Sequence, residues 1–177
     1  MENLYTAYLS IGSNKGDKKA NLLRAIDALD AHPGFRVVKQ SRFYRTQPQN
    51  FEDQDWFVNG ALAVETVMAD PEGVLVALKE IEHRLDPEGK AFRFGPRVVD
   101  LDLIFFEGHV LKTDFLELPH PRMHERYFVL EPMCDIGPGV HHPVLGKTTR
   151  ELRDNLKDKE NQEIFLLDEE APSEVFY

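Results

Sequence analysis

Apolar and polar residues in the N-terminal part of the chain follow patterns that predict a strand, a helix and two further strands. The apolar run Tyr5–Ile11 predicts the first strand. Asp17 is suited to cap a helix that reaches about Asp30, because the residues after it place apolar side chains at helical spacing: Leu22, Leu23, Ile26 and Leu29. Two more strands are predicted at Phe35–Arg45 and Trp56–Val67, with a polar loop between them.

The patterns continue with a second helix and a fourth strand. Asp70-Pro71-Glu72 is typical of a helix start, since a capping side chain precedes a proline and an acidic residue in the first turn. This helix is predicted to end before Pro87, and its buried stripe consists of Val74, Leu75, Leu78, Ile81 and Leu85. A strand containing Asp100 and Asp102 follows. The order βαββαβ predicts an α+β fold, a ferredoxin-like antiparallel sheet with both helices on one face.

The C-terminal part of the chain adds further elements to this core. We expect a strand at Val110–Leu116 and a short helix near Met123–Leu130. Residues 1–158 are predicted to form a single domain. Residues 159–177 form an acidic C-terminal tail that we expect to be partly disordered, although Ile164–Leu167 is apolar enough to dock as a last strand.

Composition narrows the classes of function. The chain has 177 residues, of which 42% are hydrophobic and 29% charged, as is ordinary for a globular protein. Its formal net charge of −10 argues against a general nucleic-acid surface, and no apolar run is long enough to span a membrane. The single cysteine, Cys134, can form neither an internal disulfide nor a cysteine zinc site. We therefore expect a cytoplasmic enzyme or binding protein, with neither nucleic acid nor membrane as a partner. A monomer is our expectation for its oligomeric state, although composition does not determine it.

The stretch Arg93–Ile104, R-F-G-P-R-V-V-D-L-D-L-I, is the most informative in the chain. In a strand, Asp100 and Asp102 share one face at a spacing of about 6.6 Å. Two like charges that are partly buried are costly, and the simplest relief is a hard cation such as Mg²⁺ shared with substrate phosphates. Arg93 and Arg97 suit forked contacts with phosphate oxygens. The stretch indicates phosphoryl or nucleotidyl chemistry, and the alternative is an exposed strand edge with ordinary surface charges.

Two other groups of residues suggest binding sites. Alternation in F-V-N-G-A-L-A-V places Phe57 and Asn59 on one face, where a ring and an amide suit a pterin or a purine; a half-exposed strand is the alternative. A cationic and aromatic cluster after Pro119 suits phosphate and ring contacts: His120, Arg122, His124, Arg126, Tyr127 and Phe128. A zinc site is the alternative use of this region, with His120, His124, His141 and His142 as ligands.

Five motifs, in the family's order, resemble those of the 6-hydroxymethyl-7,8-dihydropterin pyrophosphokinases of folate biosynthesis. They extend over about Tyr5–Leu156 and read Y-L-S-I-G-S-N (8–14), S-R-F-Y-R-T (41–46), F-V-N-G-A (57–61), R-F-G-P-R-V-V-D-L-D-L-I (93–104) and L-P-H-P-R-M-H-E-R-Y-F-V-L-E-P (118–132). The resemblance implies transfer of pyrophosphate from ATP to the hydroxymethyl group of 6-hydroxymethyl-7,8-dihydropterin, which releases AMP.

The resemblance also implies roles for individual residues. Asp100 and Asp102 would hold two Mg²⁺ ions together with ATP, and Arg97 would join them as a catalytic residue that stabilises charge on the transferred group. The pterin would contact Thr46, Phe57, Asn59 and Phe128. ATP would contact Glu82, Lys90, Arg93, Arg97, His120 and Arg126.

The chain departs from the family pattern at three places. Where relatives have Gly-Arg-x-Arg after the second helix, this chain reads L-D-P-E-G-K and leaves Lys90 and Arg93 as the cations. Phe94 stands where a tryptophan is usual, and Gln47-Pro48 replaces a pair of prolines. Two other functions remain open: a small-ligand-binding regulatory module, and a Mg²⁺-dependent nucleotidyltransferase that would release pyrophosphate instead of AMP.

Overall fold

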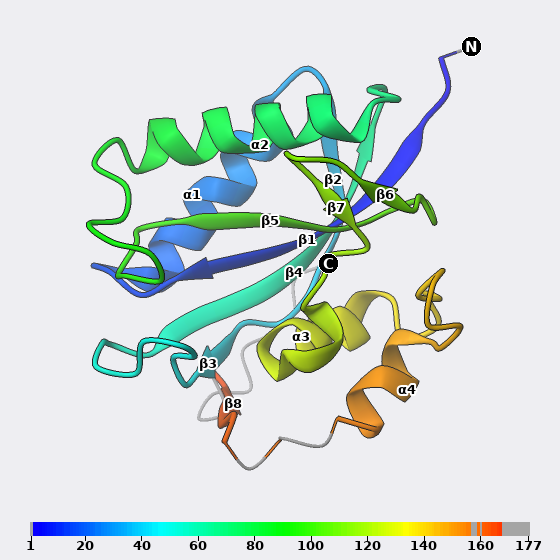
Figure 1. Cartoon of the computed structure of the whole chain (residues 1–177). Helices are drawn as coiled ribbons and strands as arrows, with labels where there is room; N and C mark the ends of the chain where they lie inside the picture. The colour runs from blue at the N-terminus through cyan, green and yellow to red at the C-terminus, as the bar shows by residue number, and fades with distance from the viewer. Residues whose placement is uncertain (1, 157–158, 160, 168–177) are drawn as a thin grey trace, which may run out of the picture.

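The structure is a computed structural model that describes residues 2–156, 159 and 161–167. Its centre is an antiparallel sheet (Figure 1) whose strands are β1 Tyr5–Ser13, β2 Phe35–Gln40, β3 Tyr44–Thr46, β4 Phe57–Thr66, β5 Asp100–Phe106 and β8 Ile164–Leu166. The strands lie in the order β5-β1-β4-β3-β8, and β2 also pairs with β4. This sheet provides both the core and the floor of the site described below.

Two helices connect strands that are not neighbours in the sheet. Helix α1, Lys18–Ala31, joins β1 to β2, and helix α2, Pro71–Leu85, joins β4 to β5. In each case one antiparallel strand lies between the two connected strands, which is the split βαβ unit. The predicted ferredoxin-like arrangement is therefore confirmed.

The two helices begin where the sequence predicts. The Asp17 carboxylate accepts a hydrogen bond from the backbone N–H of Ala20, at 3.1 Å, and caps α1. Asp70 caps α2 in the same way through the N–H of Glu72, also at 3.1 Å, with Pro71 in the first turn. Both helices pack their apolar stripes on the same face of the sheet (Figure 1).

Alternation along the strands divides their side chains between two cores. Leu9 of β1 and Leu101 of β5 are fully buried beneath α1 and α2, in the first core. Ala61 of β4 and Ile104 of β5 belong to a second core on the opposite face. Helix α3, Tyr127–Ile136, and the short helix α4, Thr149–Asp154, complete this second core (Figure 1).

The prediction of one continuous strand over Phe35–Arg45 is wrong, because the backbone leaves the sheet between β2 and β3. At this break Ser41 replaces regular strand pairing with a side-chain contact. Its backbone N–H donates to the carbonyl of Ala61 at 2.9 Å, while its hydroxyl oxygen accepts from the N–H of Ala61 at 2.7 Å. The serine hydroxyl satisfies a backbone N–H of the neighbouring strand although Ser41 is not part of a strand. The hydrophobic pattern of the sequence does not reveal such a break.

Two predicted C-terminal elements also have different bounds. The single strand expected at Val110–Leu116 is a hairpin of β6, Leu111–Lys112, and β7, Glu117–Leu118. The helix expected near Met123–Leu130 is a 3-10 turn, Met123–Glu125, followed by α3. The prediction ended this helix before Pro132, whereas α3 continues through that proline to Ile136.

Strand β8 confirms the expectation that the apolar segment Ile164–Leu167 docks as a last strand. It pairs with β3, with Thr46 opposite Ile164 and Tyr44 opposite Leu166. Residues 168–177, on which the expectation of disorder falls, lie outside the described residues, and the domain boundary near residue 158 stays a prediction. None of the helices in the described part of the chain is long and apolar enough to cross a membrane.

Candidate active site

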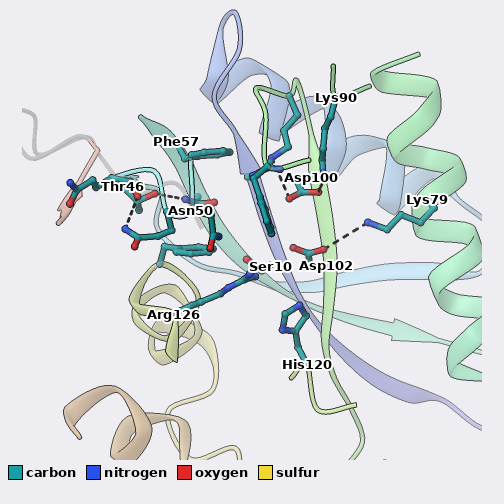
Figure 2. A pocket seen from close by; sticks show the side chains of 17 residues that line it. Ser10, Thr46, Asn50, Phe57, Lys79, Lys90, Asp100, Asp102, His120 and Arg126 are labelled. Atoms are coloured by element: carbon teal, nitrogen blue, oxygen red, sulfur yellow. Dashed lines mark hydrogen bonds and ion pairs between the residues drawn. The ribbon is translucent and has the colours of Figure 1, made fainter. Parts of the chain in front are cut away.

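A pocket lies on the half of the sheet's second face that α3 leaves open (Figure 2). Small residues of β1, Ser10 and Gly12, form part of its floor. Its walls come from residues between positions 46 and 128: Thr46, Gln47, Gln49, Asn50, Phe57, Asn59, Lys79, Lys90, Phe94, Arg97, Asp100, Asp102, His120, Arg126 and Phe128. Ten of the twelve residues that the sequence nominates line this one pocket, and Glu82 and Arg93 do not.

The aspartates of β5 project from the strand face predicted from their spacing. Asp100 lies opposite Gly12 and Asp102 opposite Ser10 in the pairing with β1, so small neighbours leave room above both carboxylates. Leu101, between them, points into the core under α2. Strand β5 does lie at the edge of the sheet, but the alternative of ordinary surface charges is wrong, because both carboxylates are only partly exposed within a pocket.

Burial and the neighbouring charge act together on Asp102. Burial, followed by the negative charge of Asp100, raises the pKa of Asp102 to about 6. Cations offset part of this cost: Lys79 Nζ lies 3.8 Å from Asp102 Oδ1, and Lys90 Nζ lies 3.7 Å from Asp100 Oδ1. The two aspartates therefore form a site of concentrated negative charge that attracts cations.

Lys79 and Glu82 of α2 hold β5 in position from the side. Lys79 Nζ donates to the carbonyl of Leu101 at 2.8 Å, and the N–H of Leu101 donates to Glu82 Oε2 at 2.9 Å. The two side chains also pair with each other at 3.0 Å. Burial opposes the charge of Lys79, yet the carboxylates of Asp102 and Glu82 raise its pKa overall. Glu82 thus stabilises the position of β5, and its predicted contact with ATP stays a prediction.

Arg97 sits between the carboxylates and an aromatic ring. Its Nε lies 3.5 Å from Asp100 Oδ2, and its guanidinium carbon lies 4.8 Å from the centre of the Phe57 ring. This Nε is buried and makes no hydrogen bond within the described residues. A buried guanidinium with unused donor capacity is suited to an anionic ligand in the pocket.

Asn14 fixes the backbone at Arg97. The N–H of Arg97 donates to Asn14 Oδ1 at 3.0 Å, and the N–H of Asn14 donates to the carbonyl of Arg97 at 3.1 Å. The Asn14 amide nitrogen also donates to Gln54 Oε1 at 2.9 Å and to the carbonyl of Asp55 at 3.1 Å. Asn14 therefore connects the loop that carries Arg97 to the loop between β3 and β4.

The opposite end of the pocket holds a buried amide. Asn59, only 5% exposed, donates through its Nδ2 to the Thr46 hydroxyl on the adjacent strand. A Cβ at Gly12 would lie 2.4 Å from Asn59 Oδ1, so only glycine admits the amide at this place. Phe57 and Phe128 line the same pocket. Two rings and a fixed amide are suited to a flat heterocycle with hydrogen-bonding edges.

His120 and Arg126 line the pocket between these two ends. Burial, followed by the charges of Arg126 and Arg122, lowers the pKa of His120 to about 4, so the ring is neutral at pH 7. His120 Nδ1 accepts the backbone N–H of Arg122 at 3.2 Å, which places the ring proton on Nε2. Burial, followed by Arg122, lowers the pKa of Arg126, whose guanidinium carbon lies 5.6 Å from the Phe128 ring centre.

The loop from Asp86 to Arg97 covers one edge of the pocket. Buried Asp86 anchors it at both ends, because its carboxylate accepts from the N–H of Gly89 at 3.1 Å and of Val98 at 3.0 Å. Lys90 reaches the pocket, whereas the guanidinium of Arg93 lies over the ring of Phe94, 4.8 Å from its centre. The predicted contact of Arg93 with ATP stays a prediction.

The donor set fits a divalent cation that is shared with a substrate. Asp100 and Asp102 offer oxygen ligands, and Mg²⁺ is typically bound by one or two carboxylates together with phosphate oxygens and water. Within residues 2–156, 159 and 161–167, no group of three or more His, Cys, Asp or Glu is arranged to hold a metal alone. The four histidines of the zinc alternative therefore form no such cluster in this part of the chain.

Several lining residues were not nominated from the sequence. Lys79 is the most informative of them, since it pairs with Asp102 from a helix 23 positions earlier in the chain. A lysine on a predicted helix is usually a solvated surface charge, so the sequence pattern does not identify Lys79 as a pocket residue. The loop residues Gln49 and Asn50 also line the pocket, and no pattern in the sequence identifies them.

Comparisons with known proteins identify the family of the chain. Residues 8–138 match the model of the 7,8-dihydro-6-hydroxymethylpterin-pyrophosphokinase family. The chain is 44% identical over 145 residues to the 2-amino-4-hydroxy-6-hydroxymethyldihydropteridine pyrophosphokinase of Methylorubrum extorquens, covering 82% of this chain and 89% of that protein. It is 39% identical over 130 residues to the enzyme of the same name from Bacillus subtilis, covering 73% and 77%.

Longer relatives contain the same region as one part. The folic acid synthesis protein FOL1 of Dictyostelium discoideum is 41% identical over 154 residues, which are 87% of this chain and 23% of that protein. Among solved structures, wild-type HPPK-DHPS of Plasmodium falciparum with pteroate aligns with a TM-score of 0.71 at 18% identity. The alignment covers 92% of this chain and 46% of that chain, and it shows the shared fold.

Proposed function

The chain belongs to the 7,8-dihydro-6-hydroxymethylpterin-pyrophosphokinase family, and on that premise we propose that the pocket over β1, β4 and β5 is its active site. The reaction is the transfer of pyrophosphate from ATP to the hydroxymethyl group of 6-hydroxymethyl-7,8-dihydropterin, in folate biosynthesis. One observation carries the assignment of the site. The carboxylate pair Asp100 and Asp102 and the buried amide of Asn59 line the same pocket, so a phosphate chain and a heterocycle can be bound side by side.

The pterin is bound at the end of the pocket that contains Thr46 and Asn59. The amide offers both a donor and an acceptor to the edge of the ring, and its orientation is supported by the Thr46 hydroxyl. Phe57 and Phe128 are the rings that contact the two faces of the heterocycle. This arrangement directs the hydroxymethyl group toward the aspartates of β5.

The phosphates of ATP are bound beside the aspartates of β5, among the cations that line the pocket. Arg97, Arg126 and neutral His120 are donors for phosphate oxygens, and Lys90 is a point charge at the edge of the pocket. Asp100 and Asp102 would hold two Mg²⁺ ions, which when bound neutralise phosphate charge and lower the pKa of an attacking hydroxyl. The contacts of Glu82 and Arg93 with ATP belong to the same proposal.

The residues of the chain act by position and charge. The hydroxymethyl oxygen forms a bond to the β-phosphorus of ATP while the bond from that phosphorus to the α-bridging oxygen breaks; AMP leaves with the electron pair, and the hydroxyl proton passes to solvent. Arg97 stabilises the charge that develops on the transferred group, because its backbone is fixed by Asn14 and its Nε has no hydrogen bond within the described residues.

Product analysis tests the proposal directly. With ATP, 6-hydroxymethyl-7,8-dihydropterin and Mg²⁺, we expect AMP and the pterin diphosphate to form in equal amounts, and no AMP without the pterin. Release of pyrophosphate would indicate the nucleotidyltransferase, and binding without turnover would indicate the regulatory module. Replacement of Mg²⁺ by EDTA should abolish turnover if the carboxylates act through a divalent ion.

The proposal also covers the oligomeric state and the cellular location of the protein. We expect the protein to be a monomer and to act in the cytoplasm, where the single cysteine would stay reduced. Light scattering coupled to size-exclusion chromatography tests the first expectation, and fractionation of cells that express the full-length protein tests the second.

A further inference from the structure

Helix α3 presents two pocket residues from its first turn but has little local support there. Arg126 occupies the N-cap position and makes no capping hydrogen bond with its side chain, which is directed instead to the pocket. The first turn contains no acidic residue. A helix start of this kind leaves backbone N–H groups that need other partners.

A proline in the next turn of α3 removes one of the hydrogen bonds that would hold this first turn. Pro132 lies inside α3 and has no N–H, so the carbonyl of Phe128, four residues earlier, receives no helical hydrogen bond from it. The turn that carries Arg126 and Phe128 is therefore less constrained by its own helix than an ordinary first turn is.

The support comes from Gln162, 35 positions later in the chain. Its Oε1 accepts the backbone N–H of Tyr127 at 2.8 Å, and its Nε2 donates to the carbonyl of Glu125 at 2.9 Å. These two backbone groups flank Arg126 on both sides. The donor and the acceptor together fix the orientation of the amide, and Gln162 is only 7% exposed. A tertiary contact thus takes the place of a local cap.

The segment around Gln162 is itself tied to the opposite wall of the pocket. The N–H of Gln47 donates to the carbonyl of Glu163 at 3.0 Å, and β8 continues the pairing along β3 next to Thr46. One short segment, residues 161–166, therefore contacts both the strand that carries Thr46 and the turn that carries Phe128. It links the two walls of the heterocycle end of the pocket.

We propose that Gln162 is a positioning residue for the pterin: its amide holds the turn that presents Phe128 and Arg126, and β8 sets the distance of this turn from Thr46. The inference rests on the proposed function, since it concerns binding of the same substrate. It assigns no contact between Gln162 and the substrate, so its effect passes through Phe128 and Arg126.

Gln162→Ala removes both hydrogen bonds and tests this role. The readouts are the dissociation constant of the pterin, measured by calorimetry with a non-hydrolysable ATP analogue present, and AMP formation. We expect the pterin to bind about tenfold more weakly, the order of effect that loss of a helix cap produces. Gln162→Glu keeps the acceptor for Tyr127 and loses the donor to Glu125, so it should show a smaller loss.

The matched control is Glu163→Ala, on the next residue of the same segment. Its side chain is exposed, and its pairing with Gln47 uses the backbone, so pterin affinity should not change. Thermal unfolding of each variant shows that the fold is kept. Should Gln162→Ala fail to fold, Gln162→Glu decides the question with the same readouts.

A double mutant separates positioning from general stability. In a Phe128→Ala background, the effect of Gln162→Ala on pterin affinity should shrink to less than about threefold, because the ring that it positions is absent. Wild-type affinity in Gln162→Ala, an equal loss in Glu163→Ala, or a full tenfold loss in the Phe128→Ala background would each overturn the proposal. If the unsubstituted protein forms no AMP, it is the proposed function that fails, and the positioning role falls with it.

Discussion

Asp102 combines partial burial with a neighbouring like charge, and both effects favour its neutral form in the folded protein. The folded pKa is about 6, compared with 3.8 as the ordinary value. The stability that this group contributes is therefore fully present below pH 3.8 and is lost as the pH rises through 6. At neutral pH without a metal, the charged carboxylate therefore destabilises the fold.

The variant Asp102→Asn should reveal this cost. Without divalent ions, we expect its melting temperature to exceed that of the unsubstituted protein at pH 8, and the difference to shrink at pH 5. Scanning calorimetry at the two pH values provides the measurement. AMP formation should be abolished in this variant and in Asp100→Ala. A stabilisation that is equal at both pH values would show that the charge of Asp102 is not its source.

Asn59 is expected to contribute to pterin binding and not to ATP binding. Asn59→Ala should weaken the pterin by about 1–3 kcal/mol, the cost of leaving buried polar partners unpaired. ATP binding should change little, since Asn59 lies on β4 and is separated from Asp100 of β5 by strand β1. Calorimetric titration with each ligand checks both statements. If the variant loses ATP affinity and keeps pterin affinity, the two ends of the pocket have been assigned in reverse.

At the scale of elements, the strands that carry the site follow from simple alternation. Leu101 and Leu103 fill the core under α2, so the aspartates between and beside them must face the other way. The same alternation in β4 separates Val58 from Asn59. Sequence reasoning succeeds here because one buried face fixes the register of the whole strand.

Two of the mispredicted elements depend on contacts between residues that are far apart in the chain. The break at Ser41 relies on the backbone of Ala61, and the first turn of α3 relies on Gln162. Helix α4 is different, since Thr148 and Glu151 form a capping box whose spacing is readable in the sequence.

Of the two cations in the loop that covers the pocket edge, Arg97 should contribute more to the chemical step than Lys90. Arg97 has a side chain only 13% exposed and a backbone fixed by Asn14, whereas the Lys90 side chain is 38% exposed. We expect Arg97→Ala to lower the rate of the chemical step about 100-fold or more, and Lys90→Ala to lower it less than tenfold. Single-turnover kinetics compare the two variants. A larger loss in Lys90→Ala would assign the catalytic cation to the loop.

At the scale of the whole molecule, the pocket is assembled from residues of four strands, two helices and the loops between them, which lie far apart in the chain (Figure 2). Motifs identify those residues whose type is unusual for their place, such as aspartates inside an apolar strand. They do not identify Lys79, because its partner Asp102 becomes a neighbour only when α2 packs on β5. The family resemblance supplied Thr46 and His120, which physical reasoning alone would have left among many candidates.

The single cysteine offers a probe of the fold as a whole. Burial raises the pKa of Cys134 from 9.0 to about 11. Two units of pKa correspond to about a hundredfold less thiolate, so iodoacetamide should modify the native protein about a hundredfold more slowly than the unfolded chain at pH 7.5. Mass spectrometry of the alkylated protein over time measures both rates. Similar rates would show that α3 exposes the thiol in the native state.

The hydrogen bonds of Asn14 have a consequence for the energetics of the two substrates. Because one amide is bonded to the loop of Arg97 and also to Gln54 and Asp55, ordering of either loop lowers the entropic cost of ordering the other. Binding of the nucleotide should then increase the affinity for the pterin. By linkage, binding of the pterin must increase the affinity for the nucleotide by the same factor. In Asn14→Ala, calorimetry should find that the nucleotide and the pterin bind independently. The affinity for each ligand would then be the same whether or not the other ligand is bound.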